Sequence, residues 1–331
     1  MNIRPTQLIR HGSFFTAVAT SQPQRYIKNM QNARTIVVCG ATGQQGACVV
    51  LSLLARGGFN VVALSRDPSS TKAAALEHLG VTVRQADLAD AASLERIFIN
   101  AHGVFGVTQP WSNDYRDVDV AAEIAQGRNI IDACQRTNVQ HLVLSTAMRI
   151  DDEPTGVPHV DSKRDIERYL LVSGVPYTLL RPGTFMDNIG AKFFPVRRGT
   201  IQGFTDGDSK LPFVSCHDIG EAAAAVFAAP ERWLDKGVNL VSDWVSGDEI
   251  CTALGKLRNE RFRWKTPPKL LMRLFAREFY TMRVKFEQSG RPPYPYHSHI
   301  NEALRQTHLL VPEFWGIERF LTASGLLERR L

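Results

Sequence analysis

A glycine-spaced turn between an apolar strand and an apolar helix constrains this chain more than any other feature. The β-branched run 35–38 leads into Gly40-Ala41-Thr42-Gly43-Gln44-Gln45-Gly46, and the apolar residues 47–54 follow as a predicted helix. In such a unit the first glycine permits a sharp turn, the second admits a pyrophosphate, and the third lets helix and strand pack closely. The helix start attracts phosphates. The unit predicts a dinucleotide site, and the alternative is a glycine-rich turn of another α/β protein.

The end of the second predicted strand indicates which dinucleotide is bound. The run 61–64 leads into Ser65-Arg66-Asp67, about 20 residues beyond the glycines, where an NAD-selective fold carries an acid for the ribose hydroxyls. The guanidinium of Arg66 suits a 2′-phosphate, because its planar fork binds phosphate through two hydrogen bonds. We therefore predict NADP (NADPH) rather than NAD, with Lys72 as a weaker candidate for the same phosphate. The alternative for Arg66 is a solvated loop residue.

Strands and helices alternate along the first half of the chain. Predicted strands cover residues 35–38, 61–64, 81–85, 103–107 and 141–145. This order predicts an α/β protein with a doubly wound parallel sheet, the Rossmann arrangement, and right-handed crossovers. Further strands are predicted at 178–183 and 237–241, and an alanine-rich helix is predicted at 221–229, with Asp218 as its N-cap or in its first turn.

The predicted domains follow from this order. Residues 1–33 form a basic leader that is disordered or serves in targeting. Residues 34–188 form an NADP-binding Rossmann domain, to which residues 214–245 return. Residues 189–213 and 246–331 form a smaller C-terminal substrate or lid region, since the periodicity is less regular beyond Thr184.

The net charge of +6 is concentrated at the front of the chain. Residues 1–66 carry seven Lys or Arg and no acid, which leaves 32 basic against 33 acidic side chains in the remainder. This distribution argues against direct nucleic-acid binding by the fold as a whole. The five cysteines lack metal-ligand spacing, so we predict free thiols, a reducing compartment and no metal site. No apolar run is long enough to span a bilayer.

The leader admits three interpretations. It contains Arg, Lys, Ser and Thr but no acid and no apolar centre, a composition typical of a mitochondrial transit peptide. A disordered tail and a start at Met30, just before the first strand, are the alternatives. We expect a cytoplasmic protein, or a mitochondrial one if the leader is a transit peptide.

Residues 257–291 interleave Arg and Lys with Phe, Trp, Leu and Tyr. A nucleic-acid or membrane face is one interpretation of this pattern. Amphipathic helices that cover a substrate cleft and keep their charges in water are the favoured one, because long charged side chains often cover apolar surface. The sequence therefore predicts a small-molecule substrate and no membrane contact, and it leaves a protein partner or a homodimer open.

The segment His159-Val160-Asp161-Ser162-Lys163 could carry chemistry. His159 and Lys163 lie four residues apart, on one face at the start of a predicted helix. The helix follows the fifth strand, so His159 and Lys163 can face a nicotinamide. Ser145 and Thr146 end that strand and are expected to point into the same region. A lysine there can bind ribose hydroxyls or act in proton transfer. A solvated lysine and a structural histidine are the alternatives.

Taken together, four segments resemble the NmrA-like family, a group of atypical short-chain dehydrogenase/reductases. They are the glycine turn 40–46, Ser65 through Pro68, His159 through Lys163, and Leu180 through Asn188. The resemblance runs from about Arg34 to the C-terminus and is strong over the Rossmann half. In the usual short-chain reductases a tyrosine stands four residues before the lysine, and this chain has His159 there.

The resemblance implies an NADP-type cofactor and two kinds of function. The implied cofactor-binding residues are Gly40, Thr42, Gly43, Gln45, Gly46, Arg66, Asp87, Thr108 and Lys163. One function is an NADP(H)-dependent oxidoreductase for a small hydrophobic organic substrate, for instance a secondary metabolite, with Lys163 or His159 as the catalytic acid/base. The other is a non-catalytic NADP(H)-binding redox sensor that acts through protein partners. The absent tyrosine favours the sensor, and the aromatic tail favours the enzyme.

Overall fold

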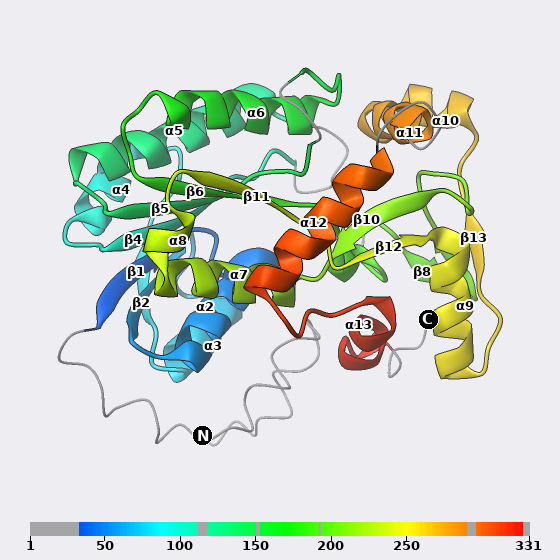
Figure 1. The fold of residues 1–331 in the computed structure, drawn as a ribbon, viewed down its shortest axis with the longest axis horizontal. Coiled ribbons are helices and arrows are strands. Elements are labelled where there is room, and N and C mark those ends of the chain that lie inside the picture. The colour runs from blue at the N-terminus through cyan, green and yellow to red at the C-terminus, as the bar shows by residue number, and fades with distance from the viewer. Residues whose placement is uncertain (1–32, 112–117, 150–152, 192, 290–295, 327–331) are drawn as a thin grey trace.

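A computed structural model describes residues 33–111, 118–149, 153–191, 193–289 and 296–326 (Figure 1). The predicted leader therefore lies outside the described residues, apart from Ala33. The leader and the predicted domain boundaries stay predictions.

The main sheet contains seven strands, all parallel, in the order β11-β6-β5-β4-β1-β2-β3. Its strands are β1 (Arg34–Val38), β2 (Phe59–Ser65), β3 (Thr82–Gln85), β4 (Gly103–Val107), β5 (His141–Ser145), β6 (Tyr177–Pro182) and β11 (Lys236–Leu240). The strand order reverses between β1 and β4. Ligands of open parallel sheets bind at such a switch point, outside the carboxyl ends of the strands.

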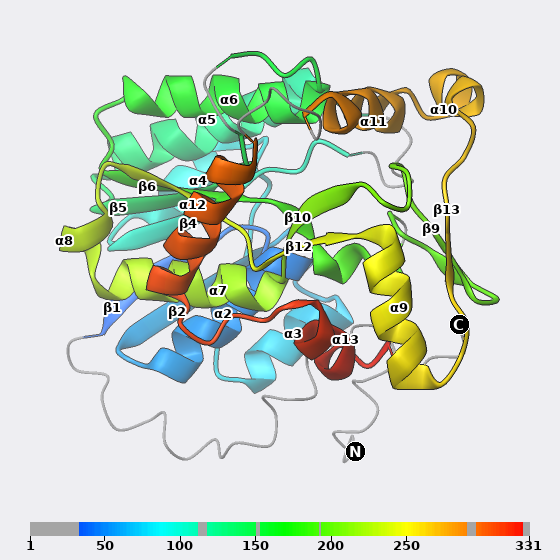
Figure 2. The ribbon, with the colours of Figure 1, turned by 45° about the vertical axis from the view of Figure 1, so that its right-hand side comes forward.

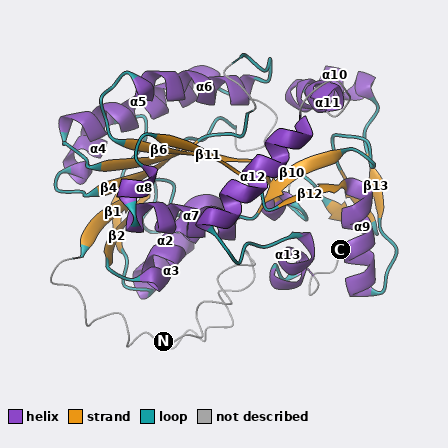
Figure 3. Ribbon diagram, in the orientation of Figure 1, coloured by secondary structure: helices purple, strands orange, loops and turns teal. Residues whose placement is uncertain are grey.

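Alternate residues of each central strand face opposite helix layers. Ile36 and Val38 of β1 belong to one apolar core, while Val37 and Cys39 belong to another. Helices α2 (Gln44–Arg56), α3 (Thr71–His78), α7 (Cys216–Ala228) and α12 (Tyr296–Leu310) cover the first face. Helices α4 (Ala91–Phe98), α5 (Val120–Arg136) and α6 (Pro158–Leu171) cover the second. The sheet lies between these layers (Figure 3), which confirms the predicted doubly wound fold.

Helix α7 begins earlier than the sequence pattern predicts. Its first residue is Cys216, and the N-cap is Ser215, whose hydroxyl accepts a hydrogen bond from the Asp218 amide. Asp218 therefore lies in the first turn, as one of the two predicted alternatives had it, and the N-cap alternative is wrong. Serine is among the best N-cap residues, so the helix begins directly after it.

The C-terminal half adds a third apolar core at one end of the main sheet (Figure 2). One small sheet has the order β12-β10-β7, and another has the order β13-β9-β8. Their strands are β7 (Thr184–Phe185), β8 (Val196–Arg197), β9 (Thr200–Gln202), β10 (Lys210–Val214), β12 (Asp243–Ser246) and β13 (Arg263–Lys265). The other elements of this half are η4 (Met186–Asn188), α8 (Pro230–Trp233), α9 (Gly247–Arg258), α10 (Lys269–Phe275), α11 (Arg277–Ser289) and α13 (Ile317–Ala323).

All five cysteines of the chain are buried and free. Burial raises the pKa of each thiol, to about 12 for Cys39. These side chains are therefore protonated and unreactive. Among the described residues, no cluster of His, Cys, Asp and Glu side chains could hold a metal ion. The helices of the described segments include none that is both long and apolar enough to cross a membrane.

Candidate dinucleotide and active site

The glycine turn joins β1 to α2 at the switch point. Gly40 has φ +62°, and a Cβ there would lie 2.9 Å from Val107 Cγ1. The Gly43 amide donates to the Gly40 carbonyl oxygen at 2.8 Å, which closes the turn. A Cβ on Gly46 would lie 2.2 Å from that same oxygen. Two of the three glycines are therefore needed for backbone reasons, since no side chain fits at these positions.

The start of α2 is open to a ligand. Its N-cap is Gly43, and no side chain caps its amides. Helices α3, α4, α5, α7 and α9 each have a side-chain cap, whereas α6, α8, α10 and α13 lack one as α2 does. Gly40, Gly43 and Gln44 are exposed, and Thr42 and Gln45 are partly exposed. Uncapped amides at an exposed helix start match the chemistry of a pyrophosphate.

Three candidate contacts for the rest of the dinucleotide follow the neighbouring strands β2 and β3 along the chain. Arg66 follows β2 directly, is exposed, and its guanidinium has no hydrogen-bond or ion-pair partner within the described chain. Lys72 is also exposed, in the first turn of α3. Asp87 follows β3, is exposed, and accepts a hydrogen bond from the Ala89 amide at 2.9 Å. These side chains are free to reorient toward a bound ligand.

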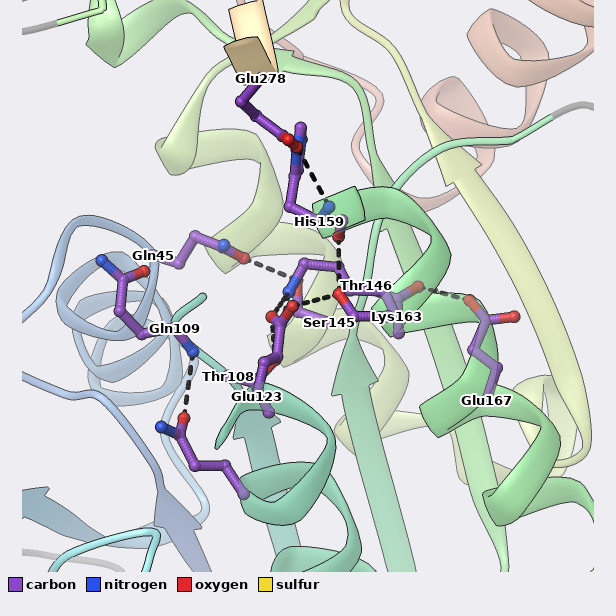
Figure 4. Close-up of polar contacts among 12 residues, drawn as sticks. Gln45, Thr108, Gln109, Glu123, Ser145, Thr146, His159, Lys163, Glu167 and Glu278 are labelled. Carbon is purple, nitrogen blue, oxygen red and sulfur yellow. Dashed lines mark hydrogen bonds and ion pairs between the residues drawn. The ribbon is translucent and has the colours of Figure 1, made fainter. Parts of the chain in front are cut away.

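Lys163 lies in a polar cluster at the carboxyl end of β4 and the first turn of α5 (Figure 4). Its Nζ donates to Glu123 Oε1 at 2.6 Å and to Thr108 Oγ1 at 3.1 Å. The Thr108 hydroxyl donates to Glu123 Oε1 at 2.7 Å, and Ser162 donates to Oε2. Glu123 is fully buried, while 12% of the Lys163 side chain is exposed. The carboxylate therefore fixes the lysine from the inside and leaves its outer side accessible.

Ser145 and Thr146, at the end of β5, point in different directions (Figure 4). Ser145 Oγ donates to Gln45 Oε1 at 2.7 Å and so reaches the glycine turn. Thr146 Oγ1 instead donates to Glu167, a buried carboxylate that also binds Arg149 and Arg181. Successive strand residues face opposite sides. Ser145 alone is therefore directed toward the predicted dinucleotide.

His159 is held by the C-terminal helices. Its Nδ1 and its backbone amide both contact Glu278 Oε1 of α11 (Figure 4). The imidazole packs on Trp111, with ring centroids 5.2 Å apart. Trp111 in turn contacts Phe193 and Phe279. The structure thus places His159 and Lys163 on one helix, but it gives them separate partners.

The segment 180–188 lies against the glycine turn, which it contacts through Asp187. The Gln44 side chain donates to the Asp187 carbonyl oxygen at 3.3 Å, and Asp187 Oδ2 accepts from the Cys216 amide at 2.7 Å. Burial raises the pKa of the Asp187 carboxyl. The two hydrogen bonds of Asp187 join the start of α7 to the start of α2.

Glu123 and Glu278 are site residues that the sequence prediction missed. A signal for Glu123 exists, because positions 123, 127, 130, 131 and 134 recur at helical spacing and all are buried. A lone carboxylate on such a stripe requires a buried partner. The partner of Glu278 lies 119 residues away in the chain, and no local pattern indicates it.

The fold and this site define a dinucleotide-binding α/β protein of the Rossmann class. The sequence matches the NmrA-like family over residues 32–320. The chain therefore belongs to the NmrA-like family, as the sequence motifs indicated.

Relatives by sequence include oxidoreductases. The NmrA-like family domain-containing oxidoreductase malD of Malbranchea aurantiaca is 27% identical over 251 residues, 70% of this chain and 75% of that protein. Quinone oxidoreductase 2 of Escherichia coli (strain K12) is 31% identical over 195 residues, 58% of this chain and 64% of that protein.

Solved structures share the fold. NmrA, a negative transcriptional regulator, has been solved with NAD and with NADP; the TM-scores are 0.70 and 0.69, at 22% identity over 90% of this chain and 96% of that one. The NADPH complex of the E. coli quinone oxidoreductase QOR2 gives a TM-score of 0.67, at 22% identity over 88% and 99% of the two chains. A triphenylmethane reductase of Citrobacter sp. with NADP(H) gives 0.67 at 20% identity over the same shares.

Proposed function

We propose that this protein is an NADP(H)-dependent oxidoreductase that acts on a small hydrophobic organic substrate. The observation that carries the proposal is the fixed ammonium of Lys163, held by the fully buried Glu123 beside the switch point. The names of the relatives, which include oxidoreductases and NADPH-bound reductases, support the same class. A nicotinamide cofactor supplies or accepts hydride when bound.

The residues of the chain then have distinct tasks. The open amides at the start of α2 bind the pyrophosphate, and Arg66 binds the 2′-phosphate. Lys163 Nζ binds a ribose hydroxyl and delivers a proton to the substrate, directly or through water. Glu123 orients Lys163, because its oxygens are shared among Lys163, Thr108 and Ser162 and it has no exposure through which to act on substrate itself.

The aromatic side chains beside His159, four residues before Lys163 on α6, indicate the class of substrate. Trp111, Phe193 and Phe279 form a mutually contacting aromatic group, and His159 packs on its edge. All three aromatic residues are partly exposed. Such a wall favours a flat, apolar substrate over a charged one.

A screen of NADPH oxidation against aldehydes, ketones, quinones and enones tests this proposal. Turnover of at least one class above the rate without protein is expected. Tight NADPH binding with no turnover in any class would overturn the enzyme assignment and favour a sensor.

The sensor is the second candidate, and one observation favours it. The position four residues before Lys163 holds His159, whose imidazole is engaged by Glu278 rather than free toward the cofactor. A sensor would bind NADP(H) through the same residues and would pass the bound state to a protein partner. Partner binding that changes with the NADPH to NADP ratio would support it.

Replacement of Arg66 by alanine is expected to weaken NADPH binding by about 1.5–3 kcal/mol and to leave NADH binding nearly unchanged, since NADH lacks the 2′-phosphate. Calorimetric titration of both dinucleotides measures this. Arg56→Ala is the matched control, because Arg56 is exposed at the opposite end of α2. An equal loss for both cofactors would contradict the role of Arg66.

Replacement of His159 by phenylalanine is expected to lower the free energy of unfolding by about 1–3 kcal/mol, because Glu278 then loses its side-chain partner while buried. Phenylalanine keeps a ring against Trp111. Urea denaturation measures the loss, and Glu278→Leu in the same chain should restore part of it. Unchanged stability with turnover reduced about a hundredfold would instead make His159 the proton donor.

A further inference from the structure

Helix α10 carries an apolar face that covers nothing in the described chain. Leu270, Leu271, Leu274 and Phe275 are 67%, 48%, 64% and 78% exposed. At the α-helical repeat these four side chains lie within about 140° of arc. Met272, on the other side of the helix, is 3% exposed and belongs to the third core. The helix is therefore anchored by one residue and presents its apolar face outward.

Basic side chains lie in the helix that carries this face and just before and after it in the chain. Residues 261–277 contain six Lys or Arg and no acid. All six are exposed: Arg261, Arg263, Lys265, Lys269, Arg273 and Arg277. Lys269 pairs with Glu287 at 2.6 Å. The guanidinium groups of Arg273 and Arg277 have no hydrogen-bond or ion-pair partner among the described residues, so their charge is available to an anionic partner.

The combination selects one kind of partner. In a symmetric dimer this face would pack on its own copy and bring two segments 261–277, each with six Lys or Arg and no acid, to one interface, where like charges repel. A membrane with anionic lipids satisfies both halves of the pattern: leucine and phenylalanine enter the boundary with the acyl chains, and arginine and lysine meet the headgroup phosphates. Helix α10 lies at the edge of the molecule in both views, where a flat surface can reach it (Figures 1 and 2).

We propose that the face formed by Leu270, Leu271, Leu274 and Phe275, together with the exposed basic residues of segment 261–277, attaches the protein to the surface of an anionic lipid membrane. The proposal departs from the sequence prediction of no membrane contact, because the structure leaves these side chains exposed rather than over a cleft. It does not rest on the oxidoreductase assignment. Helix α11 follows α10 directly, and its Glu278 contacts His159, so attachment brings the aromatic wall close to lipid.

Flotation of the full chain with vesicles tests the proposal. The probes are phosphatidylcholine vesicles with about 30% phosphatidylserine and vesicles of phosphatidylcholine alone. Wild type is expected to float with the first and much less with the second, and about 0.5 M salt should weaken the binding. Phe275→Glu and Arg273→Glu should each weaken it about tenfold or more. The matched control is Val172→Glu, at an 83% exposed position at the end of α6.

Melting temperature and NADPH affinity should match wild type in all three variants, because the replaced side chains are exposed. Equal flotation with both kinds of vesicle would overturn the proposal, and so would flotation that Phe275→Glu leaves unchanged. A wild type that fails to float but forms a dimer that Phe275→Glu dissociates would assign this face to a second copy instead. Binding to an acidic protein without flotation would likewise overturn it.

Discussion

Replacement of Lys163 by alanine is expected to lower turnover by about a hundredfold, since the change removes the group that we assign to proton transfer. Dinucleotide binding should weaken as well, because the same ammonium is assigned to a ribose hydroxyl. Steady-state kinetics with a substrate from the screen, together with NADPH titration, measure both effects. The change also leaves the Glu123 carboxylate, which is fully buried, without its charged partner. Removing one partner of such a pair costs about 3–5 kcal/mol of stability.

The stability cost must therefore be separated from the loss of chemistry. Lys163→Met with Glu123→Gln in one chain keeps the volume of both side chains and removes both charges, so it should regain most of the lost stability. Turnover should remain about a hundredfold low, because no proton is held at this position. If the double variant turns over substrate at the wild-type rate, Lys163 is not the acid/base. Glu123→Gln alone should lower turnover less than Lys163→Ala, since a neutral amide still orients the lysine.

The central strands of the main sheet could be predicted from the sequence because they are short, mainly apolar runs between turn signals. Central strands such as β4 and β5 are buried on both faces, so their inner residues, 104–105 and 142–144, are apolar. The glycine turn could be predicted because its spacing reflects backbone contacts only a few residues apart. The glycine turn and the central strands both depend on residues that are close together in the chain, and such short-range patterns can be recognised in a single sequence.

The C-terminal half could not be predicted in the same detail. Strands β7 and β8 have two residues each, too few for any period to appear. Helix α12 was not predicted. Its Thr307 hydroxyl donates to the Ala303 carbonyl oxygen and accepts from the Val241 amide, which follows β11, so a contact distant in sequence holds the helix in place. These elements are fixed by long-range packing in the third core and along β11, and such packing leaves only a weak local pattern.

In the candidate site, too, the residues of local motifs could be predicted and their distant partners could not. Lys163 and His159 could be predicted from their spacing, but the residue that holds each could not, because Glu123 and Glu278 are 40 and 119 positions away. The expectation that Ser145 and Thr146 both point toward the nicotinamide was wrong for Thr146, since strand alternation directs Ser145 to Gln45 and Thr146 to Glu167. Motifs therefore indicated which groups carry chemistry, whereas their orientation depends on partners from distant segments.

Replacement of Gly46 by alanine is expected to lower the free energy of unfolding by about 2–3 kcal/mol, because the added Cβ would lie 2.2 Å from the Gly40 carbonyl oxygen and 2.8 Å from Ala41 Cα. Both are backbone atoms, so no side chain can rotate away to relieve the clash. Relief requires the start of α2 to move from the turn by about 1 Å, a displacement sufficient to weaken NADPH binding about a hundredfold. Urea denaturation and NADPH titration measure the two losses.

Two other glycines separate these effects. Gly57→Ala places its Cβ in open space at φ +74° and ψ 174°, so it should cost about 1–3 kcal/mol through backbone strain and leave NADPH binding unchanged. Gly43→Ala places its Cβ 3.1 Å from the Gly40 oxygen, at the N-cap where the pyrophosphate is assigned. It should keep the fold and lower NADPH affinity, because the methyl group occupies the approach of the phosphate. If Gly46→Ala and Gly43→Ala both bind NADPH like wild type, the dinucleotide does not use this turn. The roles assigned to Arg66 and Lys163 would then be wrong as well, because both assume that the pyrophosphate binds there.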